Sequence, residues 1–324
     1  MEHDHDVLYR ELSRDSCSVV AAAVGLVAPP AATTINIKNR GHIMFARFSR
    51  SWELIKASGA VLRQDKELLL FPFFAAIATL LVAASFIVPL AVGGAFDRSG
   101  GESLDRASMV ILFLFYLTQY FVIFFFNSAL VGAAMIRLDG GAPAVRDGMR
   151  IASSRFVQIL GYAAIAATLG LILRVIEERA GFIGRWIAGL LGLAFTVATF
   201  LTVPILVTRD IGPLDAVKES ATLLKKTWGE NIIGNAGMGL VFFLVYLGVI
   251  GIGMLFVFGV AQTGNAPFII LVTAILALAV IAIALVQSAL QGVYSAALYR
   301  YATNGNVGAE FSGTLLSEAF RPKR

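Results

Sequence analysis

Six apolar stretches constrain this chain more than any other feature, because each is long enough to cross a bilayer. A helix needs roughly 20 apolar residues to span the hydrocarbon core. The stretches are Leu68 to Val92, Ser108 to Ile136, Phe156 to Ile176, Trp186 to Thr208, Ile232 to Val260 and Pro267 to Tyr299. Backbone groups in lipid need internal partners, so the pattern predicts an all-α membrane protein with six transmembrane helices. A composition with 58% hydrophobic and 15% charged residues agrees.

Lysine and arginine gather in alternate connections between these stretches. They are frequent before the first span, between spans two and three, between spans four and five, and after the last span. Short loops rich in Lys and Arg stay in the cytoplasm. The charge pattern therefore predicts a multi-pass protein of the cell (inner) membrane, with both termini cytoplasmic.

Residues 1–43 do not follow the membrane pattern. The run CSVVAAAVGLVAPPAA resembles the apolar part of a signal peptide, but acidic residues precede it, which suits a signal poorly. Two interpretations stay open: a disordered tail, or residues outside the translated protein, with Met44 as its start. The membrane domain is then 44–302, and 303–324 form a cytoplasmic tail.

An internal repeat organises the membrane domain. Without gaps, GAAMIRLDGGAPAVRDG from Gly132 aligns with PILVTRDIGPLDAVKES from Pro204, an offset of 72 positions. At an offset of 169 positions, RSWELIK from Arg50 matches ESATLLK from Glu219. We expect three repeats, about 45–136, 137–208 and 209–302, each an amphipathic interfacial helix followed by a transmembrane hairpin.

The predicted interfacial helices carry basic residues opposite an apolar face. Such a helix lies in the membrane surface, with its cations near lipid phosphates. The candidate contacts with anionic headgroups are Arg50, Lys56, Arg63, Arg146, Lys218 and Lys225. Trp52 and Trp228 are candidate interfacial anchors.

The segment FARFSRSWELIKASGAVLRQDKELLLFP carries a family resemblance. It resembles the opening of an uncharacterised prokaryotic multi-pass membrane family, a domain of unknown function that begins with F-S-R-S-W and continues to D-K-E-L-L-L-F-P. The resemblance covers about residues 45–302. More distantly, AVKESATLLKKTW is similar to membrane domains attached to some bacterial glycerophosphodiesterases. The resemblance implies the fold and no settled activity.

Three polar residues recur inside the spans. Thr199 follows Asn127 by the 72-residue offset, and NSALVG from Asn127 matches QSALQG from Gln287. We expect one such side chain per repeat at a common depth. They either hydrogen-bond neighbouring helices, at about 1 kcal/mol per contact, or line a central cavity for a lipid headgroup or small solute.

Two further compositional features concern packing. Span two is rich in aromatic residues, including Phe121 and Phe124, and is expected to face lipid or a bulky partner. Span five is rich in glycine, including Gly248, Gly251 and Gly253, which is typical of close helix packing.

Catalytic and cofactor signatures are missing from the sequence. No histidine follows His42, Cys17 is the single cysteine, and no Gly-x-Ser-x-Gly, Walker or dinucleotide motif occurs. We therefore expect no enzyme activity, cofactor, metal or nucleic acid partner. The leading hypothesis is a non-enzymatic inner-membrane protein in envelope or lipid homeostasis, or a subunit with a membrane protein partner or a second copy of itself. The alternative is a transporter or channel with a path near Asn127, Thr199 and Gln287.

Overall fold

The computed structural model describes residues 55–92, 106–226, 228–262 and 264–304. The chain divides into two units, Met1–Met44 and Phe45–Arg324, and every described residue belongs to the second. The predicted tail 1–43, Arg50, Trp52 and most of 303–324 lie outside the described residues. Trp228 is the first residue of a helix, but its side chain also lies outside the described part.

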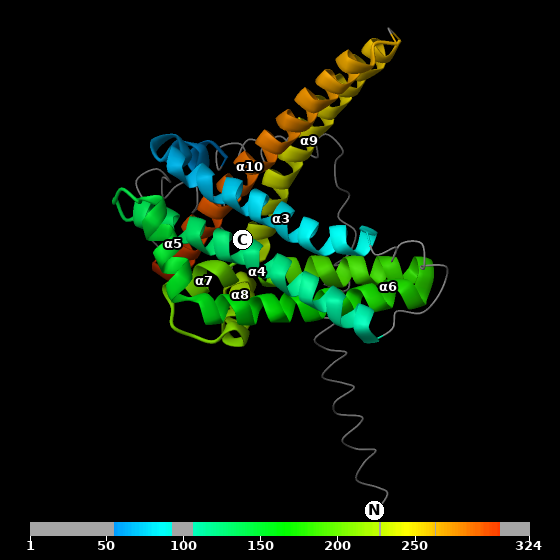
Figure 1. The fold of residues 1–324 in the computed structure, drawn as a ribbon. Coiled ribbons are helices and arrows are strands. Elements are labelled where there is room, and N and C mark those ends of the chain that lie inside the picture. The colour runs from blue at the N-terminus through cyan, green and yellow to red at the C-terminus, as the bar shows by residue number, and fades with distance from the viewer. Residues whose placement is uncertain (1–54, 93–105, 227, 263, 305–324) are drawn as a thin grey trace, which may run out of the picture. The chain divides into compact units, whose positions relative to one another are not determined.

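The described residues form helices and no strand, as the sequence predicts (Figure 1). A first helix covers 55–64. The others are η1 (Lys66–Leu69), α3 (Leu70–Val92), α4 (Arg106–Leu138), α5 (Val145–Ser154), α6 (Phe156–Ala198), α7 (Thr202–Thr208), α8 (Pro213–Lys226), α9 (Trp228–Ala261) and α10 (Ala266–Asn304). By length and composition, five of the described helical segments are apolar enough to cross a membrane.

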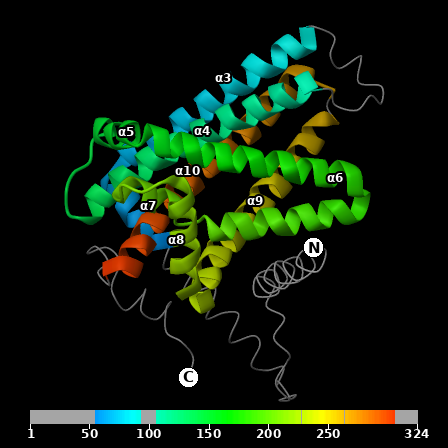
Figure 2. The same cartoon turned by 90° about the horizontal axis from the view of Figure 1, so that it is seen from below.

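The count is five rather than the predicted six because the third and fourth predicted spans are joined in α6. This helix is broken at Gly181, whose φ of 56° and ψ of −132° are not helical. The chain reverses there, and the two limbs of α6 run back alongside each other (Figure 2). A positive φ of this kind favours glycine, because a Cβ would meet the neighbouring backbone.

Three short helices border the long ones and turn one face inward. In α8, Ala216, Ser220 and Leu224 are buried, while Lys218 and Lys225 are exposed. Helix 55–64 likewise buries Ala57, Ser58, Val61 and Leu62, and α5 buries Gly148 and Ala152. A spacing of three or four residues places the buried positions of each helix on one side.

Two carboxylates hold the start of α5. The Val145 N–H donates to Glu67 Oε2 at 3.1 Å, and the Ala144 N–H donates to Asp147 Oδ2 at 3.2 Å. The first N–H groups of a helix have no partner within it, and its dipole favours negative charge there. Glu67 thereby connects η1 to α5.

The buried core lies where α4, α7 and α10 end. Its central members are Ala129–Ala134 of α4, with Ile205 and Leu206 of α7 and Val293–Tyr299 of α10. The Thr208 and Tyr299 hydroxyls, 3.0 Å apart, hydrogen-bond α7 to α10. Ion pairs surround this end of the bundle, including Arg137 with Asp65 at 3.1 Å and Arg300 with Asp139 at 2.7 Å.

Two glycines allow α4 to approach its neighbours closely. A Cβ on Gly148 of α5 would lie 2.5 Å from the Ala129 carbonyl oxygen and 2.6 Å from Phe71 Cζ. A Cβ on Gly292 of α10 would lie 2.4 Å from Leu130 Cδ2. All three distances are shorter than van der Waals contact, so a side chain at position 148 would overlap backbone, and one at position 292 would require Leu130 to move.

The aromatic row of span two, which belongs to α4, packs partly inside the protein. Phe124 stacks on Tyr162 with ring centroids 4.3 Å apart, and Phe121 meets Phe156 edge-on at 4.9 Å. Tyr162 and Phe156 belong to α6. The expectation that this row faces lipid or a bulky partner is therefore wrong for Phe121 and Phe124.

The glycines of span five divide into two groups. The helices α9 and α10 run side by side (Figure 1), and Gly253 allows close approach, since its Cβ would lie 2.3 Å from Leu276 Cδ1. Gly248, Gly251 and Gly259 face open space within the described chain. Close packing is confirmed for Gly253 and not found for the other three.

Replacement of Gly148 by alanine should destabilise the protein, because the added methyl group overlaps a carbonyl oxygen and an aromatic ring. Overpacking of this kind costs about 1–3 kcal/mol. A fall in the midpoint of thermal unfolding in detergent, measured by circular dichroism, would report it.

Gly239→Ala is the matched control, because Gly239 is also helical and has open space at its Cβ position. That variant should keep or slightly raise the midpoint, since alanine favours helix by about 1 kcal/mol over glycine. Equal midpoints for the two variants would contradict the close contact at Gly148.

Candidate intramembrane cavity

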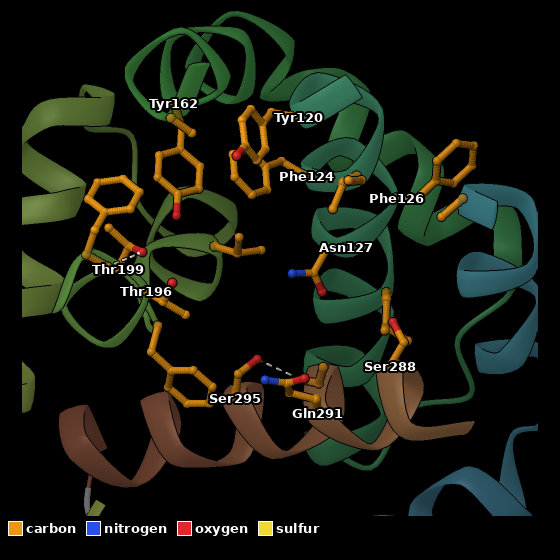
Figure 3. A pocket seen from close by; sticks show the side chains of 18 of the residues that line it. Tyr120, Phe124, Phe126, Asn127, Tyr162, Thr196, Thr199, Ser288, Gln291 and Ser295 are labelled. Carbon is orange, nitrogen blue, oxygen red and sulfur yellow. Dashed lines mark hydrogen bonds between the residues drawn. The ribbon is translucent and has the colours of Figure 1, made fainter. Parts of the chain in front are cut away.

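A cavity of about 470 Å³ lies among the long helices (Figure 3). Residues of α3, α4, both limbs of α6 and α10 line it. Its volume is within the range of small-molecule sites, about 300–1,000 Å³. The cavity adjoins the buried core, since Leu130, Val203 and Ser295 belong to both.

Two of the three residues predicted to share a common depth line this cavity. Asn127 projects from α4, and Thr199 follows the last residue of α6. Gln287 is not among the lining residues, whereas Gln291, one turn later on α10, is. The sequence echo between Asn127 and Gln287 therefore identifies the correct helix but the wrong turn. Ser288 and Ser295 complete the polar lining contributed by α10.

The hydroxyl groups of the lining mostly donate to their own helices. Thr199 Oγ1 donates to the Phe195 carbonyl at 2.8 Å, Thr196 Oγ1 to the Gly192 carbonyl at 2.9 Å, and Ser295 Oγ to the Gly292 carbonyl at 2.9 Å. Their protons are therefore occupied, and their remaining lone pairs are available to the cavity.

The two carboxamides differ from the hydroxyls. Among the described residues, neither Asn127 nor Gln291 has a hydrogen-bond partner for its side chain. Asn127 points into the cavity (Figure 3), and its Oδ1 lies 3.6 Å from the position that a Cβ on Gly292 would take. A carboxamide that is desolvated without a partner is costly, so these groups favour a polar occupant.

The remainder of the lining is apolar. Phe124 stacks on Tyr162, whose hydroxyl points toward Thr199 (Figure 3). Ile123, Leu169 and Leu173 lie further from the core end along α4 and α6. The cavity therefore has a polar region beside Asn127 and an apolar region along α4 and the first limb of α6.

The cavity is open at its side. Four lining residues are exposed: Ile123, Thr196, Ser288 and Gln291. Thr196 belongs to the second limb of α6, and Ser288 and Gln291 belong to α10. Because these positions are inside predicted spans, the opening faces the lipid-covered surface of the protein.

No aspartate, glutamate, lysine, arginine or histidine is among the described residues that line the cavity. Groups of three or more His, Cys, Asp or Glu that could hold a metal ion are also lacking in the part of the chain the structure describes. The cavity is therefore polar but uncharged.

The predicted lipid-contact residues lie elsewhere. Lys56 and Arg63 are exposed on helix 55–64, Arg146 on α5, and Lys218 and Lys225 on α8. Lys218 lies 3.7 Å from Asp215. None of the five lines the cavity, so the basic surface and the cavity are separate features.

Comparison with known proteins gives one family. Comparison with the curated proteins gave no match. A family of unknown function, DUF6159, matches residues 106–310, which include α4–α10 and most of the residues that line the cavity. The F-S-R-S-W opening precedes the matched residues. Because the match covers more than half of the chain, the protein belongs to the DUF6159 family of unknown function.

Proposed function

We propose that this is a non-enzymatic integral membrane protein that binds a lipid-like amphiphile in the cavity between α4, α6 and α10. The proposed role is in envelope or lipid homeostasis. The observation that carries the proposal is the cavity itself, which presents two unpaired carboxamides and opens toward lipid. A site that is polar at one end, apolar at the other and open at the side suits a molecule already dissolved in the bilayer.

The family resemblance of the sequence supports the same setting. The similarity of AVKESATLLKKTW to membrane domains attached to glycerophosphodiesterases favours a lipid context. A second candidate function is transport of such a molecule, or of a small solute, along the path near Asn127 and Thr199. The position of these two side chains on one cavity favours it.

The architecture that we propose has six spans in three repeats, with both termini cytoplasmic. Its support comes from equivalent contacts at the 72-residue offset. Gly148 of α5 lies against the Ala129 carbonyl, and Ser220 of α8 accepts a hydrogen bond from the Leu201 N–H at 3.1 Å. Ser220 follows Gly148 by 72 positions, and Leu201 follows Ala129 by 72. The two short helices thus meet corresponding points on the preceding long helices.

Anionic lipid is the proposed partner of the basic faces on helix 55–64, α5 and α8. Arg63, Arg146 and Lys225 are exposed there, and each cation near an anionic surface contributes about 1 kcal/mol. This binding would orient the protein and is independent of the cavity.

Six spans require the turn at Gly181 to reach the outer face of the membrane. A single cysteine at Arg179, introduced after Cys17→Ser, should react with a membrane-impermeant maleimide in intact spheroplasts. A cysteine at Lys218 should react only after the membrane is permeabilised. Protection of position 179 in both preparations would mean that it lies within the membrane, and would refute six spans.

Removal of three exposed cations should weaken association with anionic lipid. For the combined variant Arg63→Gln, Arg146→Gln and Lys225→Gln, we expect about a tenfold or greater loss of bound phosphatidylglycerol, counted by native mass spectrometry. Arg179→Gln with Arg185→Gln is the control, because both arginines lie beside the break in α6 at Gly181 and not on the proposed basic faces. Equal losses for both sets would count against the proposed surface.

Filling the cavity should expel its occupant. Gly192 lines the cavity, and Gly192→Leu would place an isobutyl group inside it. In native mass spectra of protein released from native membranes, we expect the unmodified chain to carry a co-purified lipid. The amount of bound lipid should fall about tenfold in the Gly192→Leu variant, which corresponds to the loss of about 1.4 kcal/mol of binding free energy.

Gly189→Leu is the matched control, because Gly189 belongs to the same limb, has open space at its Cβ position and does not line the cavity. It should retain the lipid. If both variants keep the lipid equally, or if the unmodified chain carries none, the proposed binding function is wrong.

A further inference from the structure

We infer that the cavity selects an amphiphile with an uncharged, hydroxyl- or amide-bearing head, held by Asn127 and Gln291, whose chain leaves between the second limb of α6 and α10. This inference rests on the proposed function and adds the chemical class of the ligand. The observations that carry it are the hydrogen-bonding state of the lining, its lack of charge and the position of its opening.

The hydrogen-bonding state defines what the head must offer. A carboxamide carries two N–H donors and one carbonyl acceptor. Since Asn127 and Gln291 are unpaired and the neighbouring Thr196, Thr199 and Ser295 donate to their own helices, the cavity as a whole offers both donors and acceptors. A hydroxyl or an amide on the ligand can pair with both the donors and the acceptors of the cavity, whereas an ester carbonyl or an ether can pair only with the donors.

The lack of charge excludes ionised heads. No acidic or basic residue is among the described residues that line the cavity. An ion moved from water into an apolar site without a counter-charge is strongly unfavourable. The exposed cations Lys218 and Lys225 lie on α8, outside the cavity. A phosphate head would therefore remain at those cations, and an uncharged head would enter.

The opening defines where the chain goes. The exposed lining residues Thr196 and Ser288 belong to the second limb of α6 and to α10, and the apolar residues Ile123, Leu169 and Leu173 continue from the polar region. A volume of about 470 Å³ is sufficient for a head and the first part of a chain. The remainder of the chain would lie in the bilayer.

Photolabelling tests the head-group class directly. The full chain in nanodiscs is labelled with a photoreactive diacylglycerol, and the labelled peptides are mapped. We expect saturable labelling of peptides from α4, α6 and α10. Unlabelled diacylglycerol and a long-chain polyprenol should compete at least about tenfold better than phosphatidic acid, which has the same two chains as diacylglycerol but a charged head.

Variants test the two carboxamides. Asn127→Leu and Gln291→Leu should each reduce saturable labelling about tenfold, the effect of one lost hydrogen bond of about 1.4 kcal/mol. Gln287→Leu is the matched control, because Gln287 is the same residue type on the same helix and does not line the cavity. It should label like the unmodified chain.

Three results would overturn the inference. Phosphatidic acid could compete as well as diacylglycerol, or both leucine variants could leave the labelling unchanged. Saturable labelling could also be absent, which would mean that water alone fills the cavity. The first result does not depend on any variant folding. If Gly192→Leu expels an anionic lipid, binding is supported and the head-group class is wrong. If Gly192→Leu changes no bound lipid, the proposed function itself fails.

Discussion

Helix α4 packs closely against both α5 and α10. At Gly148 and Gly292 a single added carbon would overlap neighbouring atoms. The backbone of α5 at Gly148 lies against the backbone of α4, and the backbone of α10 at Gly292 lies against the Leu130 side chain. In lipid, helices gain little from burying apolar surface, and close packing of small residues is what holds them together. Residues Ala129–Ala134 are consequently buried, and the cavity lies beside them at Asn127 and Leu130.

The cavity lies next to this close packing. On one side of Leu130 the side chains interlock, and on the other side Asn127 points into open volume bounded by both limbs of α6. The reversal at Gly181 brings the second limb back against the first, so that Gly170 and Gly192 lie on the same cavity. The ligand that we propose would therefore enter beside the buried core and would not need to unpack it.

Much of the fold could be predicted from the chain alone. Helices in the predicted stretches follow from length and hydrophobicity, because a bilayer leaves the backbone few alternatives. Contacts between helices could not be predicted in the same way. The row containing Phe121 and Phe124 has the composition of a lipid-facing surface, yet these rings pack on Tyr162 and Phe156. The sequence does not distinguish an apolar side chain that is covered by lipid from one that is covered by another helix.

A helical, apolar, multi-pass protein could be predicted from the chain alone, and so could a relation between Asn127 and Thr199 through their 72-residue spacing. That these two residues line a common cavity, and that Gln291 rather than Gln287 lines it with them, follows only from how the helices pack. The physical reason is rotation about the helix axis. The 72-residue spacing relates positions along the chain, but the face that each residue presents depends on how its helix packs, and here Gly148 and Gly292 lie at close contacts with α4.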